Sequence, residues 1–233
     1  MRIIFFISIL ITFLYPFYAQ STETNQTVIS KLDSISHSES ISRYFAAIYL
    51  VTTKKAAVHF SDYSERSKSL IARLELKFAN LFFEAAQAKQ KGSTIPTEWQ
   101  SYYSDNSLQP LQYLLLGINI HINENIWEAL IEEFTSSEFE EFKPIYFEYY
   151  NLLKKIYSEV YQMAWSENNK IKRLHSFSFG LDEVYGKIML KRWRRRQFRL
   201  AELYFADPVS FQTNYAVLQK KVVATNNLIK RIL

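Results

Sequence analysis

Four polar residues recur at every second position of an otherwise apolar stretch in the middle of the chain, PLQYLLLGINIHINENIWEALIEEF, residues 110–134. They are Asn119, His121, Asn123 and Asn125. His121 has the side chain best suited to catalysis, because an imidazole beside a carboxylate can act as a general base or as a metal ligand. On a helical wheel Glu124 and Glu128 lie within two turns on its side. His121, Glu124 and Glu128 are therefore the candidate catalytic residues.

The asparagines of the same stretch suggest a structural role. At about 100° per residue, Asn119 and Asn123 fall close together between two apolar stripes. A helix with two apolar flanks is surrounded by other helices, which predicts that these amides are buried. A buried amide needs a partner, because an unsatisfied polar group costs about 1 to 3 kcal/mol. We therefore expect a polar network of Asn119, Asn123 and Asn125, with Asn151 of a later helix.

Familiar catalytic signatures are absent from the chain. There is no Gly-rich phosphate loop, no His-Glu-x-x-His, no Glu-x-x-His and no Gly-x-Ser-x-Gly. The chain has no cysteine, so disulfides and thiolate metal sites are excluded. No cofactor is predicted. A divalent metal at His121 is the less favoured alternative, because the central stretch supplies too few ligands and His59, His175 or residues 138–141 would have to complete the site.

A basic run, KIMLKRWRRRQFR at residues 187–199, is the second candidate site. Its cations are Lys187, Lys191, Arg192, Arg194, Arg195, Arg196 and Arg199. Such a run can hold an anionic ligand or an anionic surface, with Trp193 as a partial anchor. The alternative is that the run is solvated or faces the acidic span of residues 124–148. Nucleic acid is not an expected partner, because an exported protein seldom meets it; no other partner is indicated.

The N-terminus indicates export. Residues 1–19 combine one basic residue, about a dozen apolar residues, Pro16 and a small residue at Ala19, a pattern typical of a signal peptide. An uncleaved N-terminal anchor is the alternative. No second long apolar run follows, so no transmembrane segment is expected after signal removal. We expect a periplasmic or secreted protein.

Composition favours helices throughout. The 233 residues are 48% hydrophobic and include only four glycines, which disfavours a fold rich in turns or strands. After a mobile polar leader at 20–40, we expect residues 41–233 to form one all-α domain, a bundle of about six or seven helices around a central buried helix at about 110–134. The other expected helices cover about 40–60, 62–91, 97–100, 144–174, 181–206 and 208–233, with a turn at 176–180.

The central stretch also resembles the hallmark helix of a bacterial family known only as a domain of unknown function. In that family Pro-Leu-Gln leads to Gly-x-Asn-Ala-His-Ile-Asn-x-Asp-Leu, and the likeness extends from about Phe45 to Leu203. The matching residues are Pro110, Leu111, Gln112, Gly117, Asn119, His121, Ile122 and Asn123. The resemblance implies a fold and the location of a site, but no activity.

The departure from the family pattern lies four residues after the histidine. Asn125 stands where the family has aspartate, and an amide cannot carry the charge of a metal ligand or of a residue that orients a base. We therefore interpret the chain first as an exported binding or structural module whose central helix carries a polar network. The alternative is a hydrolase-like or metal-assisted site centred on His121.

Overall fold

The computed structural model describes residues 24–166 and 181–232, which form one all-α arrangement without a strand in that part of the chain. Residues 24–36 are helical. The α-helices after them are α2 (Arg43–His59), α3 (Glu65–Lys91), α4 (Gln100–Tyr103), α5 (Pro110–Ile120), α6 (Ile126–Glu133), α7 (Ser136–Ser166), α9 (Leu181–Ala206) and α10 (Pro208–Ile232). The all-α fold expected from composition is confirmed. The expected signal peptide at 1–19 and the turn at 176–180 lie outside the described residues.

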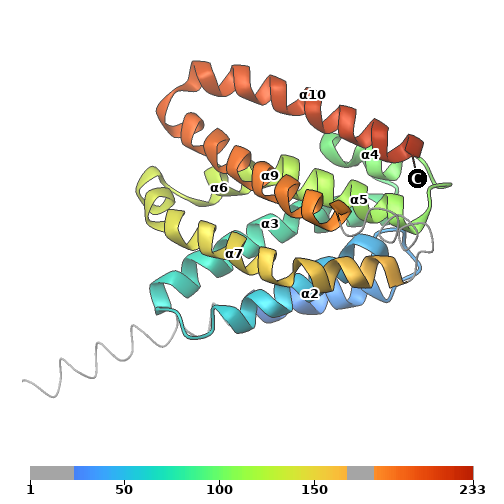
Figure 1. The fold of residues 1–233 in the computed structure, drawn as a ribbon, viewed down its shortest axis with the longest axis horizontal. Coiled ribbons are helices and arrows are strands. Elements are labelled where there is room, and N and C mark those ends of the chain that lie inside the picture. Colours follow the sequence, from blue (N-terminus) through green and yellow to red (C-terminus); the bar gives the residue numbers. More distant parts are fainter. Residues whose placement is uncertain (1–23, 167–180, 233) are drawn as a thin grey trace, which may run out of the picture.

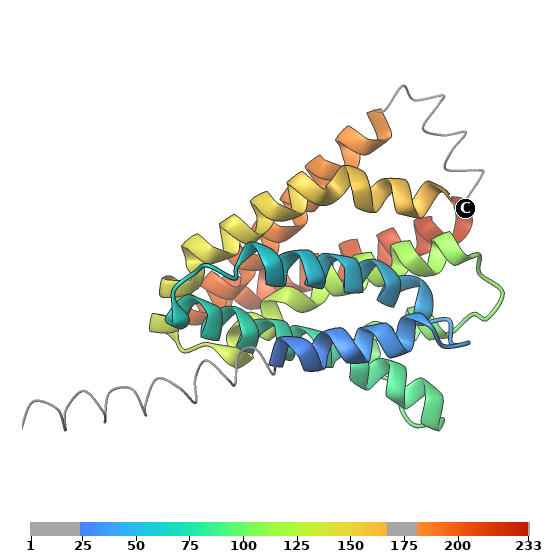
Figure 2. The same ribbon diagram turned by 90° about the horizontal axis from the view of Figure 1, so that it is seen from below.

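The central rod consists of α5, a short π-helical segment and α6 in direct succession. α5 packs against α2 and α10, whereas α6 packs against α3 and α9. Figure 1 shows this rod between α10 on one side and α2, α3 and α7 on the other. In Figure 2 the end of α10 lies beside the start of α5, where the Gln112 side chain donates to the carbonyl oxygens of Ile229 and Lys230 at 3.3 and 3.1 Å. The expected central buried helix is therefore present, though interrupted.

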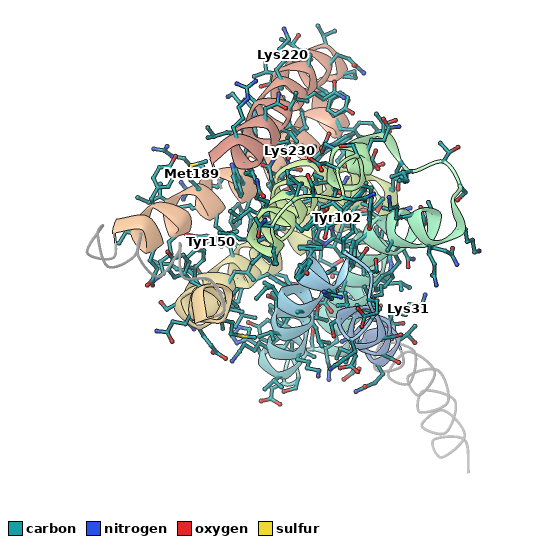
Figure 3. The ribbon with its side chains drawn as sticks, turned by 90° about the vertical axis from the view of Figure 1, so that its right-hand side faces the viewer. Lys31, Tyr102, Tyr150, Met189, Lys220 and Lys230 are labelled. Atoms are coloured by element: carbon teal, nitrogen blue, oxygen red, sulfur yellow. The ribbon has the colours of Figure 1, made fainter. Side chains whose placement is uncertain are left out.

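The aromatic residues of the chain form most of its core. One cluster joins α2, α3, α4 and α5 around Phe45, Phe82 and Trp99. A second joins α3, α6, α7 and α9 around Phe139 and Phe198, whose rings stack at 4.5 Å between centroids. Figure 3 views the helices nearly end-on, with Tyr102 in the interior.

Local signals set most helix boundaries. Ser64 caps α3 by accepting from the Ser67 N–H, and Gly92 ends it with a left-handed φ of 66°, which costs a glycine little. Asp207 caps α10 by accepting from the Ser210 N–H at 3.1 Å. α9 covers Leu181–Ala206, the span expected from the sequence.

Two expectations need correction. The segment 20–40 was expected to be a mobile leader, but residues 24–36 are helical because Val28 and Leu32, one turn apart, are buried in the core. Pro144 was expected in the first turn of its helix and instead lies inside α7. α7 begins earlier because Thr135 and Glu138 form a reciprocal capping box: the Glu138 N–H donates to Thr135 Oγ1, and the Thr135 N–H donates to the Glu138 carboxylate.

Candidate functional site

The π-helical segment His121–Asn125 contains the residues that the sequence singled out. In an uninterrupted α-helix the Trp127 N–H would donate to the Asn123 carbonyl oxygen. Gln197 of α9 bonds both groups instead: its Nε2 donates to that carbonyl at 2.6 Å, and its Oε1 accepts from the Trp127 N–H at 3.0 Å. The fully buried Gln197 side chain thus satisfies the backbone at the interruption.

Asn119 and Asn123 lie in one buried hydrogen-bonded chain. Asn123 Nδ2 donates to Asn119 Oδ1 at 2.9 Å, and Asn119 Nδ2 donates to Asn226 Oδ1 of α10 at the same distance. Asn226 in turn donates to Ser101, and Arg196 of α9 donates to Asn123 Oδ1. The chain of bonds therefore ties α4, α9 and α10 to the central rod.

The other two members of the expected network lie elsewhere. Asn151 is exposed on α7 and donates to Glu148 at 3.3 Å. Asn125 is fully buried, but its amide makes no hydrogen bond of normal length to another described residue. It still lowers the pKa of Glu128 through an interaction with that carboxyl. The structure therefore joins two of the four asparagines.

His121 lies in a box of aromatic rings. Its imidazole stacks on Phe78 with 3.5 Å between centroids, and the rings of Tyr49, Phe45 and Trp99 lie 4.7, 5.3 and 6.2 Å away. The side chain is buried, and neither ring nitrogen has a hydrogen-bond partner among the described residues. Burial therefore lowers the pKa of His121 well below its usual value, and the ring is neutral at physiological pH.

The structure does not bring Glu124 or Glu128 to His121. Burial is the main cause that raises the pKa of both carboxyls to about 7, and the negative charge of Glu98 raises both further. The charge of Glu128 also raises the pKa of Glu124. Within the described ranges no three histidine, aspartate or glutamate side chains are grouped so that they could hold a metal ion. The geometry around His121 therefore supplies neither a carboxylate partner nor a ligand set.

A cavity of about 430 Å³ is lined by His121 and by three of the rings around it, those of Phe45, Tyr49 and Phe78. It falls within the volume range of small-molecule sites, roughly 300 to 1,000 Å³. Its lining comes from α2, α3, α5, α6, α7, α9 and α10 and is mostly aliphatic and aromatic. Met189, labelled in Figure 3, lines it from α9. Tyr185 also lines it and is 61% exposed, which places that end of the cavity at the surface.

One wall of the cavity is polar. Glu75 of α3 accepts a hydrogen bond from the Tyr149 hydroxyl at 3.1 Å, and its second carboxyl oxygen has no partner. Burial raises the pKa of Glu75 to about 7. The Arg194 guanidinium lies 4.4 Å from the Tyr146 ring centroid and 5.3 Å from that of Tyr149. Glu75 has the one carboxyl group and Arg194 the one guanidinium among the described residues of the lining.

The basic run does not form one surface. Arg194 is buried in the lining of the cavity, Arg196 donates to Asn123, and Lys187 pairs with Glu183 at 2.7 Å. Arg199 pairs with Glu202 at 3.2 Å. The exposed remainder is Lys191, Arg192 and Arg195.

The acidic span meets α3 rather than the basic run. Arg73 contacts Glu133 and Glu138 at 2.7 Å each, and Lys77 contacts Glu132 at 2.6 Å. These pairs fasten α3 to the ends of α6 and α7. The acidic stretch thus pairs mainly with α3, whereas the ion pairs of the basic stretch join it to glutamates of its own helix.

Sequence reasoning missed Glu75, Tyr149 and Gln197. A signal existed for two of them. Glu75 interrupts the apolar stripe of α3 between Ile71 and Ala79, and Gln197 lies one turn before the buried Ala201 of α9. Polar residues on a buried stripe are the ones expected to face a partner or a ligand.

Residues 26–233 match a family described as "Family of unknown function (DUF5995)". The chain belongs to this family, in agreement with the uncharacterised family expected from the central stretch. No curated protein and no solved structure matched the chain. In the described ranges, no helix combines the length and the apolar character needed to cross a membrane.

Proposed function

We propose that this member of a family of unknown function is an exported binding protein that takes an apolar small molecule into its interior cavity. The cavity itself carries the proposal. A void of about 430 Å³ with an apolar lining leaves side chains without packing partners, which a ligand would supply.

The buried asparagine chain supports this function indirectly. Asn119 and Asn123, together with Gln197, fix α9 and α10 to the central rod by buried hydrogen bonds. Helices fixed in this way resist collapse into the void, because closing it would break buried hydrogen bonds. The polar network is therefore proposed to maintain the binding site rather than to perform chemistry.

Uptake of a neutral fluorescent reporter, N-phenylnaphthylamine, tests the proposal. We expect its emission to rise on mixing with the wild-type protein. Ile156 lines the cavity, so Ile156→Trp should fill part of it and reduce uptake several-fold. Val217→Trp, on the exposed side of α10, is the matched control and should leave uptake unchanged.

Two outcomes would overturn the binding proposal. One is no uptake by the wild-type protein, and the other is equal uptake by the wild-type protein and both variants. Circular dichroism of each variant shows whether it is folded. Export is tested separately, by sequencing the N-terminus of the protein recovered from the periplasm or medium of the expressing cell. The signal pattern predicts a start directly after Ala19.

A further inference from the structure

Arg194 is the one cation that lines the cavity among the described residues. Its side chain is 93% buried, since it retains 7% exposure. No hydrogen bond or ion pair joins its guanidinium to another described residue, and its Nε lies buried without a partner. A buried guanidinium that lacks a counter-charge is costly, and the tyrosine rings beside it offset only part of that cost.

Glu75, which has the one carboxyl group in the described lining, does not neutralise this guanidinium. Glu75 and Arg194 form no ion pair, and the Tyr149 ring interacts with both groups. Tyr149 instead donates its hydroxyl hydrogen to Glu75. Glu75 thus bonds Tyr149 rather than Arg194, and the guanidinium in the cavity lining has no anionic partner among the described residues.

The rest of the lining defines the remainder of a ligand. Leu115, Leu153, Val160, Leu190 and Ile229 are among its aliphatic residues. They offer dispersion contacts but no directional bonds, which suits a flexible hydrocarbon chain. The exposed Tyr185 marks the end that reaches solvent, whereas Arg194 and Glu75 lie in the buried wall.

The charge of the site limits the charge of the ligand. One guanidinium compensates one negative charge, and its planar fork matches a carboxylate in two hydrogen bonds. A doubly charged phosphate monoester would retain an uncompensated buried charge beside Glu75, which is unfavourable. The observations therefore favour a monoanion on a hydrocarbon chain.

Resting on the cavity function proposed above, we infer that the ligand is a long-chain carboxylate whose head group pairs with Arg194 while its chain fills the apolar cavity. Glu75 is not a ligand contact in this arrangement. It is a positioning residue that holds Tyr149 beside the guanidinium.

Competition between N-phenylnaphthylamine and two matched ligands tests this inference. Dodecanoate and dodecanol share one chain length and differ in the head group. Arg194→Met removes the charge at similar side-chain length, and Arg195→Met removes an exposed neighbouring charge as the control. We expect Arg194→Met to weaken dodecanoate by at least about tenfold while dodecanol changes by less than about twofold, because a buried pair loses its partner. Arg195→Met should change neither affinity.

The outcomes separate this inference from the binding function beneath it. If Arg194→Met weakens both ligands equally, or leaves dodecanoate unchanged, the role of Arg194 is refuted while the binding function stands. If neither ligand displaces the reporter from the wild-type protein and the reporter itself is not taken up, the binding function fails as well.

A measurement on the wild-type protein covers the case in which Arg194→Met does not fold. Dodecanoate labelled with carbon-13 at the carboxyl group is titrated in its complex and followed by NMR. A guanidinium in contact should lower the pKa of the bound carboxyl below that of the free acid. A raised pKa, as burial without a cation would produce, would overturn the inference.

Discussion

The side-chain amide of Gln197 donates to the backbone carbonyl oxygen of Asn123 at 2.6 Å, and its oxygen accepts from the Trp127 N–H, so one buried residue of α9 bonds both groups that an α-helix would join directly. The π-helical segment of the central rod therefore depends on a residue 74 positions further along the chain. This contact links the geometry of the rod to the position of α9, which also carries Arg194.

Replacing Gln197 tests that dependence. Gln197→Met keeps the size of the side chain but leaves a buried N–H and a buried carbonyl oxygen without their partner. We expect the free energy of unfolding to fall by about 3 kcal/mol, measured by urea denaturation. Gln212→Met, on the exposed face of α10, is the control and should cost less than about 0.5 kcal/mol. Equal losses in the two variants would contradict the role given to Gln197.

His121 is expected to act as an aromatic core residue. Because neither ring nitrogen has a partner and four aromatic rings surround the imidazole, His121→Phe should be tolerated far better than His121→Ala. The alanine variant loses the stacking on Phe78 and should cost about 3 kcal/mol in thermal or urea unfolding. A phenylalanine variant as unstable as the alanine variant would show that the imidazole nitrogens contribute to stability.

Gly117 is required by the approach of α2. A Cβ atom at this position would lie 2.5 Å from Cγ and 2.7 Å from Cβ of Phe45, which is too close for either atom to stay in place. We expect Gly117→Ala to destabilise the protein by about 1 to 3 kcal/mol. The loss should be smaller in a Phe45→Ala background, which removes the Cγ atom and the ring beyond it. Additive losses in the double mutant would exclude this contact as the cause.

The buried carboxyl group of Glu75 should make the stability of the folded protein depend on pH. Burial raises its pKa from 4.5 to about 7, so the folded state holds a proton that the unfolded state releases. The stabilisation is therefore complete below about pH 4.5 and is lost as pH rises through about 7. The shift corresponds to about 3 kcal/mol. In Glu75→Gln this contribution is absent, so wild-type stability should fall relative to that of the variant between pH 4.5 and 8.

The comparison with Glu75→Gln removes the effects of other titrating groups. The lowered pKa of His121 acts in the opposite direction, because its neutral form is favoured in the folded state and stability is lost as pH falls below its ordinary value. This contribution is common to both proteins. If the two stability curves run parallel from pH 4.5 to 8, Glu75 is not buried as described.

Short-range signals made much of the fold predictable from sequence. The capping residue Asp207 and the following Pro208 located the start of α10, and Gly92 located the end of α3. The amide pair Asn119 and Asn123 was expected to be buried because its apolar flanks were evident. Each of these features depends on residues within a few positions of one another.

The functional geometry depends on contacts between distant segments. A wheel of constant angle placed His121 beside Glu124 and Glu128, but the π-helical segment begins at His121 and changes the angular relation of all later residues. The polar wall unites Glu75 of α3 with Arg194 of α9, and no local pattern pairs them. Arg194 was read as part of a basic surface because the run around it is continuous in sequence, whereas successive residues of a helix face different directions.

The central claim is that the cavity holds a long-chain carboxylate with its head group at Arg194. A crystal structure of the wild-type protein grown with ω-bromododecanoate tests it most directly, because the anomalous signal of bromine locates the end of the chain. We predict bromine density inside the cavity and carboxylate density within hydrogen-bond distance of the Arg194 guanidinium. Bromine density only on the protein surface, or a cavity closed by its own side chains, would contradict the claim.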